Sequence, residues 1–263
     1  MAEQLFSRKD LKRLIFPLVL EQFLAMTIGA CDTVMVSSVG EAGVSGVSLI
    51  DQWAQLFIQL FAAFATGGAV VSSQYLGHKS DESARMAARQ LLNISAFVAF
   101  VIIALCLPLR HFILNLIYGK IDEVVMQNAL VYFVWVLLSF PFLAIYNSCA
   151  ALFRSMGNSK VSLKVSLMMN LTNILGNAVL IYGAKIGVAG AGIATLVSRI
   201  VAASVMVFLL SKKSARQNNR IYFEKLWKIE IRFEMIKKIL QVAVPSGIEN
   251  SVFHIGKILV YSF

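Results

Sequence analysis

The sequence has little charge for its length. Of its 263 residues, 14% are Asp, Glu, Lys or Arg, whereas 58% are hydrophobic. A soluble globular domain carries about 25% charged residues, so this composition excludes an ordinary soluble domain and predicts an all-α, polytopic membrane protein. The net charge is nevertheless +10. We interpret this excess of Lys and Arg as a topology signal in the loops and expect no nucleic-acid partner.

Cysteine and enzyme motifs are also scarce. The three cysteines, Cys31, Cys106 and Cys149, lie inside apolar runs at a spacing that fits no metal site, so we assign them to packing. The sequence contains no GxxxxGK[ST] phosphate loop, no HExxH and no GxSxG. We therefore expect no enzymatic activity, no cofactor, no bound metal and no direct use of ATP.

Long apolar runs are what the sequence has in abundance. Seven of them cover residues 11–36, 48–74, 91–109, 124–150, 161–183, 188–210 and 239–263. A helix needs about 20 apolar residues to cross a bilayer, so each run predicts a transmembrane helix. The long polar segment 211–238 divides them. We expect a six-helix N-terminal lobe over 1–210, an inter-lobe linker over 211–238, and the first helix of an incomplete second lobe over 239–263.

The basic residues predict the orientation in the membrane. They concentrate before the first run and in the second, fourth and sixth loops, the last of which is the linker. Because Lys and Arg are enriched in cytoplasmic loops, the N-terminus and the linker are expected in the cytoplasm. The first run is too long for a cleavable signal peptide. The sequence thus predicts a multi-pass protein of the inner (plasma) membrane.

Three residues of the first run are poorly suited to lipid: Pro17, Glu21 and Asp32. At about 100° per residue, Glu21 and Asp32 fall within roughly 20° of one helix face. A carboxyl group at mid-membrane costs at least about 2.5 kcal/mol, so both are expected to face a watery, protein-lined interior. Asp32 is the strongest candidate for binding Na⁺ or H⁺. Glu21 serves either in gating or in a structural hydrogen bond near Pro17.

A short internal repeat supports the division at the linker. Pro17 and Glu21 recur as Pro245 and Glu249, with the same step of four residues. Both runs are predicted to cross in the same direction, which indicates a parallel repeat of the kind found in transporters built from two halves. We therefore assign Pro245 and Glu249, like Pro17 and Glu21, to a gating or auxiliary role.

Polar residues also interrupt the later runs. Asn170, Asn173 and Asn177 share one helix face, where amides either coordinate a cation or hold helices together. Asp51 belongs to a polar stripe in the second run, and Arg199 in the sixth needs a partner. The pattern alone leaves the roles of these residues open.

Several motifs in this order resemble the multidrug and toxic compound extrusion (MATE) transporters. They are Pro17 followed by Asp32-Thr-Val-Met-Val and Gly40; Arg154-Ser-Met-Gly-Asn-Ser-Lys160; Asn177-Ala-Val-Leu-Ile-Tyr-Gly183; and the glycine-rich run from Gly187 to Thr195 that continues to Ser198-Arg199. The resemblance covers essentially the whole chain. It implies a V-shaped transporter of two six-helix lobes, of which this chain holds the first lobe and the first helix of the second.

The resemblance also implies roles for individual residues. Asp32 matches the first-helix aspartate of the family, its leading cation or proton site. Asn173 and Thr195 match polar partners in the N-terminal lobe, and Tyr132 matches a polar partner in the fourth helix. Asn177 stands where some members have a second aspartate, which removes one titratable group from this lobe.

The expected function is secondary active efflux by alternating access, in which cationic or amphipathic drugs are exchanged for Na⁺ or H⁺. One alternative is a flippase for lipid-linked saccharides in the same superfamily. It would need a more cationic cavity, whereas away from the ends of the apolar runs only Arg199 and Lys257 are basic. The other alternative is a truncated fragment that does not transport.

Overall fold

The structure, a computed structural model, describes residues 15–17, 19–21, 23, 33–119, 121–211, 220–223 and 231–261, the last twelve of these without their side chains. Every regular element in this part is helical, which confirms the all-α fold. The helices are α2 (Glu41–Gly77), α3 (Asp81–Cys106), α4 (Arg110–Tyr118), α5 (Glu123–Ser155), α6 (Ser159–Asn177), the π-helix η1 (Ala178–Gly183), α7 (Val188–Ser211) and α9 (Phe233–Tyr261). Parts of the first run, including 33–37, are helical too.

Five helical segments are long and apolar enough to cross a membrane, judged by length and composition. They are α2, α3, α5, α6 together with η1, and α7, and they coincide with the second to sixth apolar runs. The helices extend beyond several of those runs: α2, for example, has 37 residues. The short helix α4 lies between two apolar runs, in a segment for which the sequence predicts only a loop. The helix α9 begins at Phe233, inside the range predicted for the linker.

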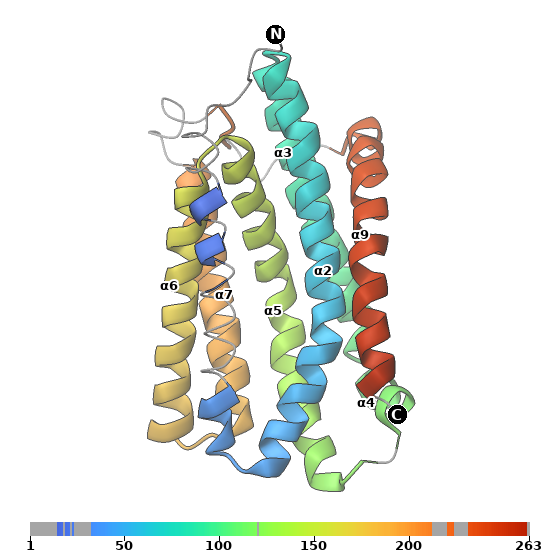
Figure 1. The fold of residues 1–263 in the computed structure, drawn as a ribbon, viewed down its shortest axis with the longest axis vertical. Helices are drawn as coiled ribbons and strands as arrows, with labels where there is room; N and C mark the ends of the chain where they lie inside the picture. Colours follow the sequence, from blue (N-terminus) through green and yellow to red (C-terminus); the bar gives the residue numbers. More distant parts are fainter. Residues whose placement is uncertain are drawn as a thin grey trace.

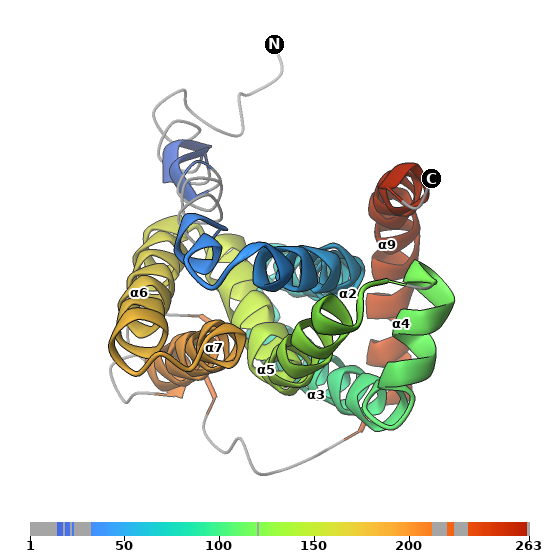
Figure 2. The same cartoon turned by 90° about the horizontal axis from the view of Figure 1, so that it is seen from below.

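The helices form an up-and-down bundle (Figure 1). The helix α5 lies in the centre and packs against α2, α3 and α7, while α6 packs chiefly on α7. Seen along the bundle, α6 and α7 lie on one side and α9 on the other (Figure 2). The helix α9 packs along α2, so α2 separates it from the α6–α7 pair.

An aromatic cluster joins α2 to α5. Trp53 lies with its ring centroid 4.5 Å from that of Phe133 and 6.0 Å from that of Phe140. Phe61 meets Phe140 edge to face at 5.6 Å. Phe61, Phe133 and Phe140 are fully buried. Such ring pairs add about 0.5–1.5 kcal/mol each beyond the area that they bury, so they stabilise the contact between these two helices.

Glycines allow the other helices to approach closely. A Cβ atom on Gly192 of α7 would lie 2.6 Å from the Cβ of Trp135 on α5, and one on Gly67 of α2 would lie 2.8 Å from the Cβ of Ala243 on α9. Real Cβ atoms essentially never show contacts this short, so a larger residue at either position would force a shift. The close approach of helices at small residues is typical of membrane bundles, where van der Waals packing replaces the hydrophobic effect.

Candidate functional site

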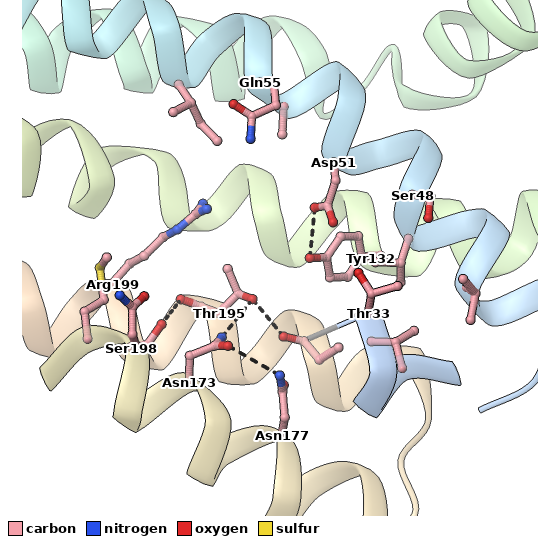
Figure 3. Close-up of a pocket in the computed structure, with 18 residues that line it drawn as sticks. Thr33, Ser48, Asp51, Gln55, Tyr132, Asn173, Asn177, Thr195, Ser198 and Arg199 are labelled. Atoms are coloured by element: carbon pink, nitrogen blue, oxygen red, sulfur yellow. Dashed lines mark hydrogen bonds between the residues drawn. The ribbon is translucent and has the colours of Figure 1, made fainter. Parts of the chain in front are cut away.

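A cavity of about 240 Å³ opens between α2, α5, α6, α7 and the helical residues just before Gly40. Figure 3 shows its polar residues pointing toward one another from these separate elements. The polar lining consists of Thr33, Ser48, Asp51, Gln55, Tyr132, Asn170, Asn173, Asn177, Thr195, Ser198 and Arg199. A polar cavity of this size is unusual inside a membrane bundle, where polar groups mark pathways for ions or substrates.

One wall of the cavity is an amide–hydroxyl chain between α6 and α7. The Asn177 Nδ2 donates to Asn173 Oδ1 at 3.4 Å, and Asn173 Nδ2 donates to Thr195 Oγ1 at 3.3 Å. The Thr195 hydroxyl donates to the carbonyl of Ala191 at 3.0 Å. Asn173 and Asn177 are buried. These hydrogen bonds hold the side-chain oxygen atoms of Asn173, Asn177 and Thr195 in one arrangement along the wall. Hard cations prefer oxygen ligands of this kind.

Backbone geometry brings this wall together. A Cβ on Gly176 would lie 2.9 Å from the Cβ of Ala194, the residue before Thr195. Because Gly176 has no side chain, α6 can approach α7 closely enough for the amide of Asn173 to reach the hydroxyl of Thr195. The π-helix η1 starts directly after Asn177. π-Turns inside helices are rare and frequently mark functional sites.

The opposite wall carries a carboxylate that is held by a tyrosine. The hydroxyl of Tyr132 on α5 donates to Asp51 Oδ1 on α2 at 3.1 Å. Tyr132 is buried, whereas Asp51 is exposed and lines the cavity. Figure 3 shows the two side chains facing each other across the gap between α2 and α5. This arrangement fixes a negative charge at the cavity wall.

Arg199 contributes a positive charge to the same cavity. Its Nη1 donates to the hydroxyl of Ser139 on α5 at 2.6 Å. An arginine inside a membrane bundle normally faces the interior and interacts with polar partners, and Arg199 follows this rule. The cavity therefore holds charges of both signs.

The structure brings together four of the five residues predicted for the cation site. Tyr132, Asn173, Asn177 and Thr195 all line the cavity, while their role in ion binding remains a prediction. Asp32 lies outside the described residues. The next residue, Thr33, is described and lines the cavity.

Glu21 occupies a separate site near the start of α6, at the opposite end of that helix from Asn173 and Asn177. Its carboxylate accepts a hydrogen bond from the Ser162 hydroxyl at 2.8 Å and lies 3.8 Å from Nη1 of Arg154 at the end of α5. Tyr146 lies beside the same carboxylate. Glu21 is not part of the cavity lining. The structure thus separates Glu21 from the predicted cation site and pairs it with an arginine.

The second proline–glutamate pair lies on α9, away from the cavity. Ile239, Ala243 and Gly247 face α2, whereas Pro245 and Glu249 are exposed. Pro245 lies within a continuous helix. Pro17, by contrast, is buried.

Sequence reasoning does not select two residues that hold predicted site residues: Asp51, which contacts Tyr132, and Arg154, which contacts Glu21. Asp51 is only one member of a polar stripe, and the stripe does not show that it reaches the cavity. Arg154 belongs only to a loop motif. The signal for Asp51 is its acidic character inside an apolar run, the same criterion that selects Asp32.

Comparisons with known proteins agree with this architecture. A family model described as MatE matches residues 17–179. The "Uncharacterized transporter YisQ" of Bacillus subtilis is 28% identical over 259 residues, which cover 95% of this chain and 54% of the relative. The "Probable multidrug resistance protein NorM" of Thermotoga maritima is 26% identical over 259 residues, covering 96% of this chain and 53% of the relative.

A solved structure has the same fold. It is described as the outward-facing conformation of a multidrug resistance MATE family transporter of the MOP superfamily. It superposes with a TM-score of 0.83 at 21% sequence identity, over 92% of this chain and 52% of that protein. The chain therefore spans about half the length of the relatives that it matches.

Proposed function

Because the chain belongs to the MatE family, we propose that it forms the N-terminal lobe, and the first helix of the second lobe, of a secondary active multidrug transporter. The transporter exports cationic or amphipathic compounds in exchange for Na⁺ or H⁺. The observation that carries this proposal is the cavity in which Tyr132, Asn173, Asn177 and Thr195 converge with Asp51 from four helices of the lobe.

The coupling cation binds at this cavity. Asp32 supplies the main carboxylate, and Asn173, Asn177, Thr195 and Tyr132 supply amide and hydroxyl groups around it. Asp51 adds a second carboxylate from α2. This matters because Asn177 leaves α6 without the aspartate that the resemblance leads us to expect in some members. With two carboxylates in the cavity, the lobe holds either a sodium ion or protons.

Alternating access uses the proline–glutamate pairs. Pro17 cannot donate a backbone hydrogen bond and weakens its helix locally, so the first helix bends there when the cation binds or leaves. The ion pair of Glu21 with Arg154 ties that helix to α5 on one side of the bend. Pro245 and Glu249 have the corresponding function in the second lobe, whose remaining helices lie beyond the matched half of the relatives.

The protein resides in the plasma membrane with its N-terminus in the cytoplasm. This orientation places Glu21 and Arg154 toward the cytoplasm and the cavity toward the outer side. The cation then enters the cavity from outside, down its inwardly directed gradient. The partners of the protein are the lipid bilayer, the coupling ion and the drug.

Dye efflux tests this function. The protein is expressed in a drug-sensitive bacterium as the wild type and as Asp32→Asn, the cells are loaded with a cationic dye, and a Na⁺ or pH step is imposed. Export that follows the ion step and is lost in Asp32→Asn supports the proposal. Export that Asp32→Asn leaves unchanged contradicts the coupling role of Asp32. Absence of export, with both proteins in the membrane, shows that this half does not transport without the remainder of the second lobe.

A further inference from the structure

A second pocket lies beside the first turns of α3. These turns are at the end of the bundle where α2 ends and α9 begins (Figure 1). Its volume is about 440 Å³. It is lined by Glu82, Arg85, Met86, Arg89, Gln90, Tyr222 and Arg232. These residues come from α3, from the segment 220–223 and from the residues just before α9. We call it the arginine pocket.

Positive charge dominates the arginine pocket. Three guanidinium groups face one carboxylate, that of the exposed Glu82. Arg85 and Arg89 stand one turn apart on α3, a spacing at which like charges repel each other. Among the described residues, none of the three arginines forms an ion pair with a carboxylate. The nearby Asp81 is instead paired with Arg220, at 2.6 Å.

The guanidinium groups are held in place by their surroundings. Arg85 Nε donates to the carbonyl of Asp81 at 3.2 Å, and its guanidinium lies 4.6 Å from the ring centroid of Tyr222. The backbone N–H of Arg232 donates to Gln90 Oε1 at 3.3 Å, which joins the two walls of the pocket. Arg89 Nε is buried and has no hydrogen-bond partner in the described part of the chain. A buried donor without a partner is costly, and a bound anion would remove that cost.

The pocket lies where α3 passes from charged to apolar sequence. The ten residues from Asp81 to Gln90 include four charged side chains, and the apolar run begins at Leu91. The start of α9 shows the same change near Lys238, whose Nζ donates to the hydroxyl of Tyr75 at 2.9 Å. Such a boundary corresponds to the headgroup level of a bilayer, where lipid phosphates are concentrated.

We propose that the arginine pocket binds a phosphate group, carried either by an anionic phospholipid headgroup or by free phosphate. Arginine forks match phosphate oxygens with paired, charge-assisted hydrogen bonds. Basic pockets between membrane helices bind anionic headgroups in this way. A bound phosphate would bridge the start of α3 to Arg232 beside α9, and it would stabilise the junction between the lobe and the next helix. The inference does not depend on transport.

Lipid-dependent stability tests the proposal. The purified chain is placed in nanodiscs of phosphatidylcholine, with or without phosphatidylglycerol, and the midpoint of thermal unfolding is measured. A third arm adds inorganic phosphate to the phosphatidylcholine discs. Specific binding to the folded state is expected to raise the midpoint by about 4 °C or more. Arg85→Gln/Arg89→Gln should lose most of that shift.

The matched control is Lys160→Gln/Lys164→Gln, which removes the same charge from exposed positions on α6 outside the pocket. It should retain the shift. A shift with phosphatidylglycerol alone identifies the lipid headgroup as the ligand, and a shift with inorganic phosphate identifies free phosphate as sufficient. The proposal is wrong if neither probe shifts the midpoint, or if the arginine and lysine variants lose equal parts of the shift. If the double arginine variant does not fold, the exposed Arg232→Gln provides the same comparison at the other wall.

Discussion

The hydroxyl of Tyr132 on α5 donates a 3.1 Å hydrogen bond to the carboxylate of Asp51 on α2. The two residues are 81 positions apart in the sequence. Their contact places a carboxylate opposite the Asn173–Thr195 pair, in a cavity that all these residues line. The lobe therefore contains an acidic group in its second helix in addition to any contribution from the first.

Neutralising Asp51 tests whether that carboxylate binds the coupling cation. Asp51→Asn keeps the shape of the side chain and removes its charge, so we expect the affinity for the cation to fall about tenfold, or roughly 1.4 kcal/mol. Tryptophan fluorescence during a cation titration is the measurement. Glu41→Gln is the matched control, since Glu41 lies on the same helix but outside the cavity. Equal affinities for Asp51→Asn and Glu41→Gln would exclude this role.

Adding a carboxylate at Asn177 should have the opposite effect. Asn177→Asp is nearly isosteric and introduces a negative charge beside Asn173, so we expect about a tenfold rise in cation affinity. Asn115→Asp supplies the same change at an exposed position on α4, outside the cavity. The same titration compares the two variants. A cation affinity that stays at the wild-type value in Asn177→Asp would show that the α6 wall does not contact the ion.

The close contact of α6 with α7 should be sensitive to a single methyl group. In Gly176→Ala the new Cβ would lie 2.9 Å from that of Ala194, which forces the helices apart near Thr195. Overpacking of this kind costs about 1–3 kcal/mol, and cation affinity should fall as well. Gly183→Ala is the control, because its Cβ would meet no atom within 4 Å. SDS titration in mixed micelles reports the free energy of unfolding, and equal values for the two variants would refute the prediction.

The pair of Glu21 and Arg154 is suited to a double-mutant cycle. The two side chains are 14% and 33% exposed and lie 3.8 Å apart, so part of the interaction is screened by solvent. We expect Glu21→Gln and Arg154→Gln each to lower the free energy of unfolding, with a coupling energy of about 0.5–1 kcal/mol. The exposed Glu249→Gln should have little effect. Strict additivity of the two substitutions would mean that the pair does not hold the first helix.

The sequence predicts the helices far better than it predicts their contacts. Hydrophobic runs identify the spanning helices because about 20 apolar residues in a helix match the thickness of the hydrocarbon core of a bilayer. Helix ends are missed where polar residues extend a helix beyond its apolar run, as Glu41 does in α2 and Glu234, Lys237 and Lys238 do in α9. Run lengths measure the apolar core and not the whole helix.

The candidate site is likewise predicted in part: several of its residues follow from the sequence, and their contacts do not. The motif resemblance selects Asn173, Asn177, Thr195 and Tyr132, which the structure gathers at one cavity. It could not select Asp51, because that residue reaches the cavity only through the packing of α2 on α5. Periodicity predicts that Glu21 and Asp32 share one helix face. It does not predict that Glu21 contacts Arg154. Periodicity assigns residues to a face, and tertiary packing decides what that face contacts.

Direct cation binding to the purified chain is the measurement closest to the central claim. Retention of radioactive sodium, and proton uptake after a pH step in sodium-free buffer, are compared for the wild type, Asp32→Asn, Asp51→Asn and the control Glu41→Gln. The account predicts saturable binding of one of these ions, lost in Asp32→Asn, weakened in Asp51→Asn and unchanged in Glu41→Gln. Equal binding by all four proteins, or binding by none, would contradict a cation site in this cavity.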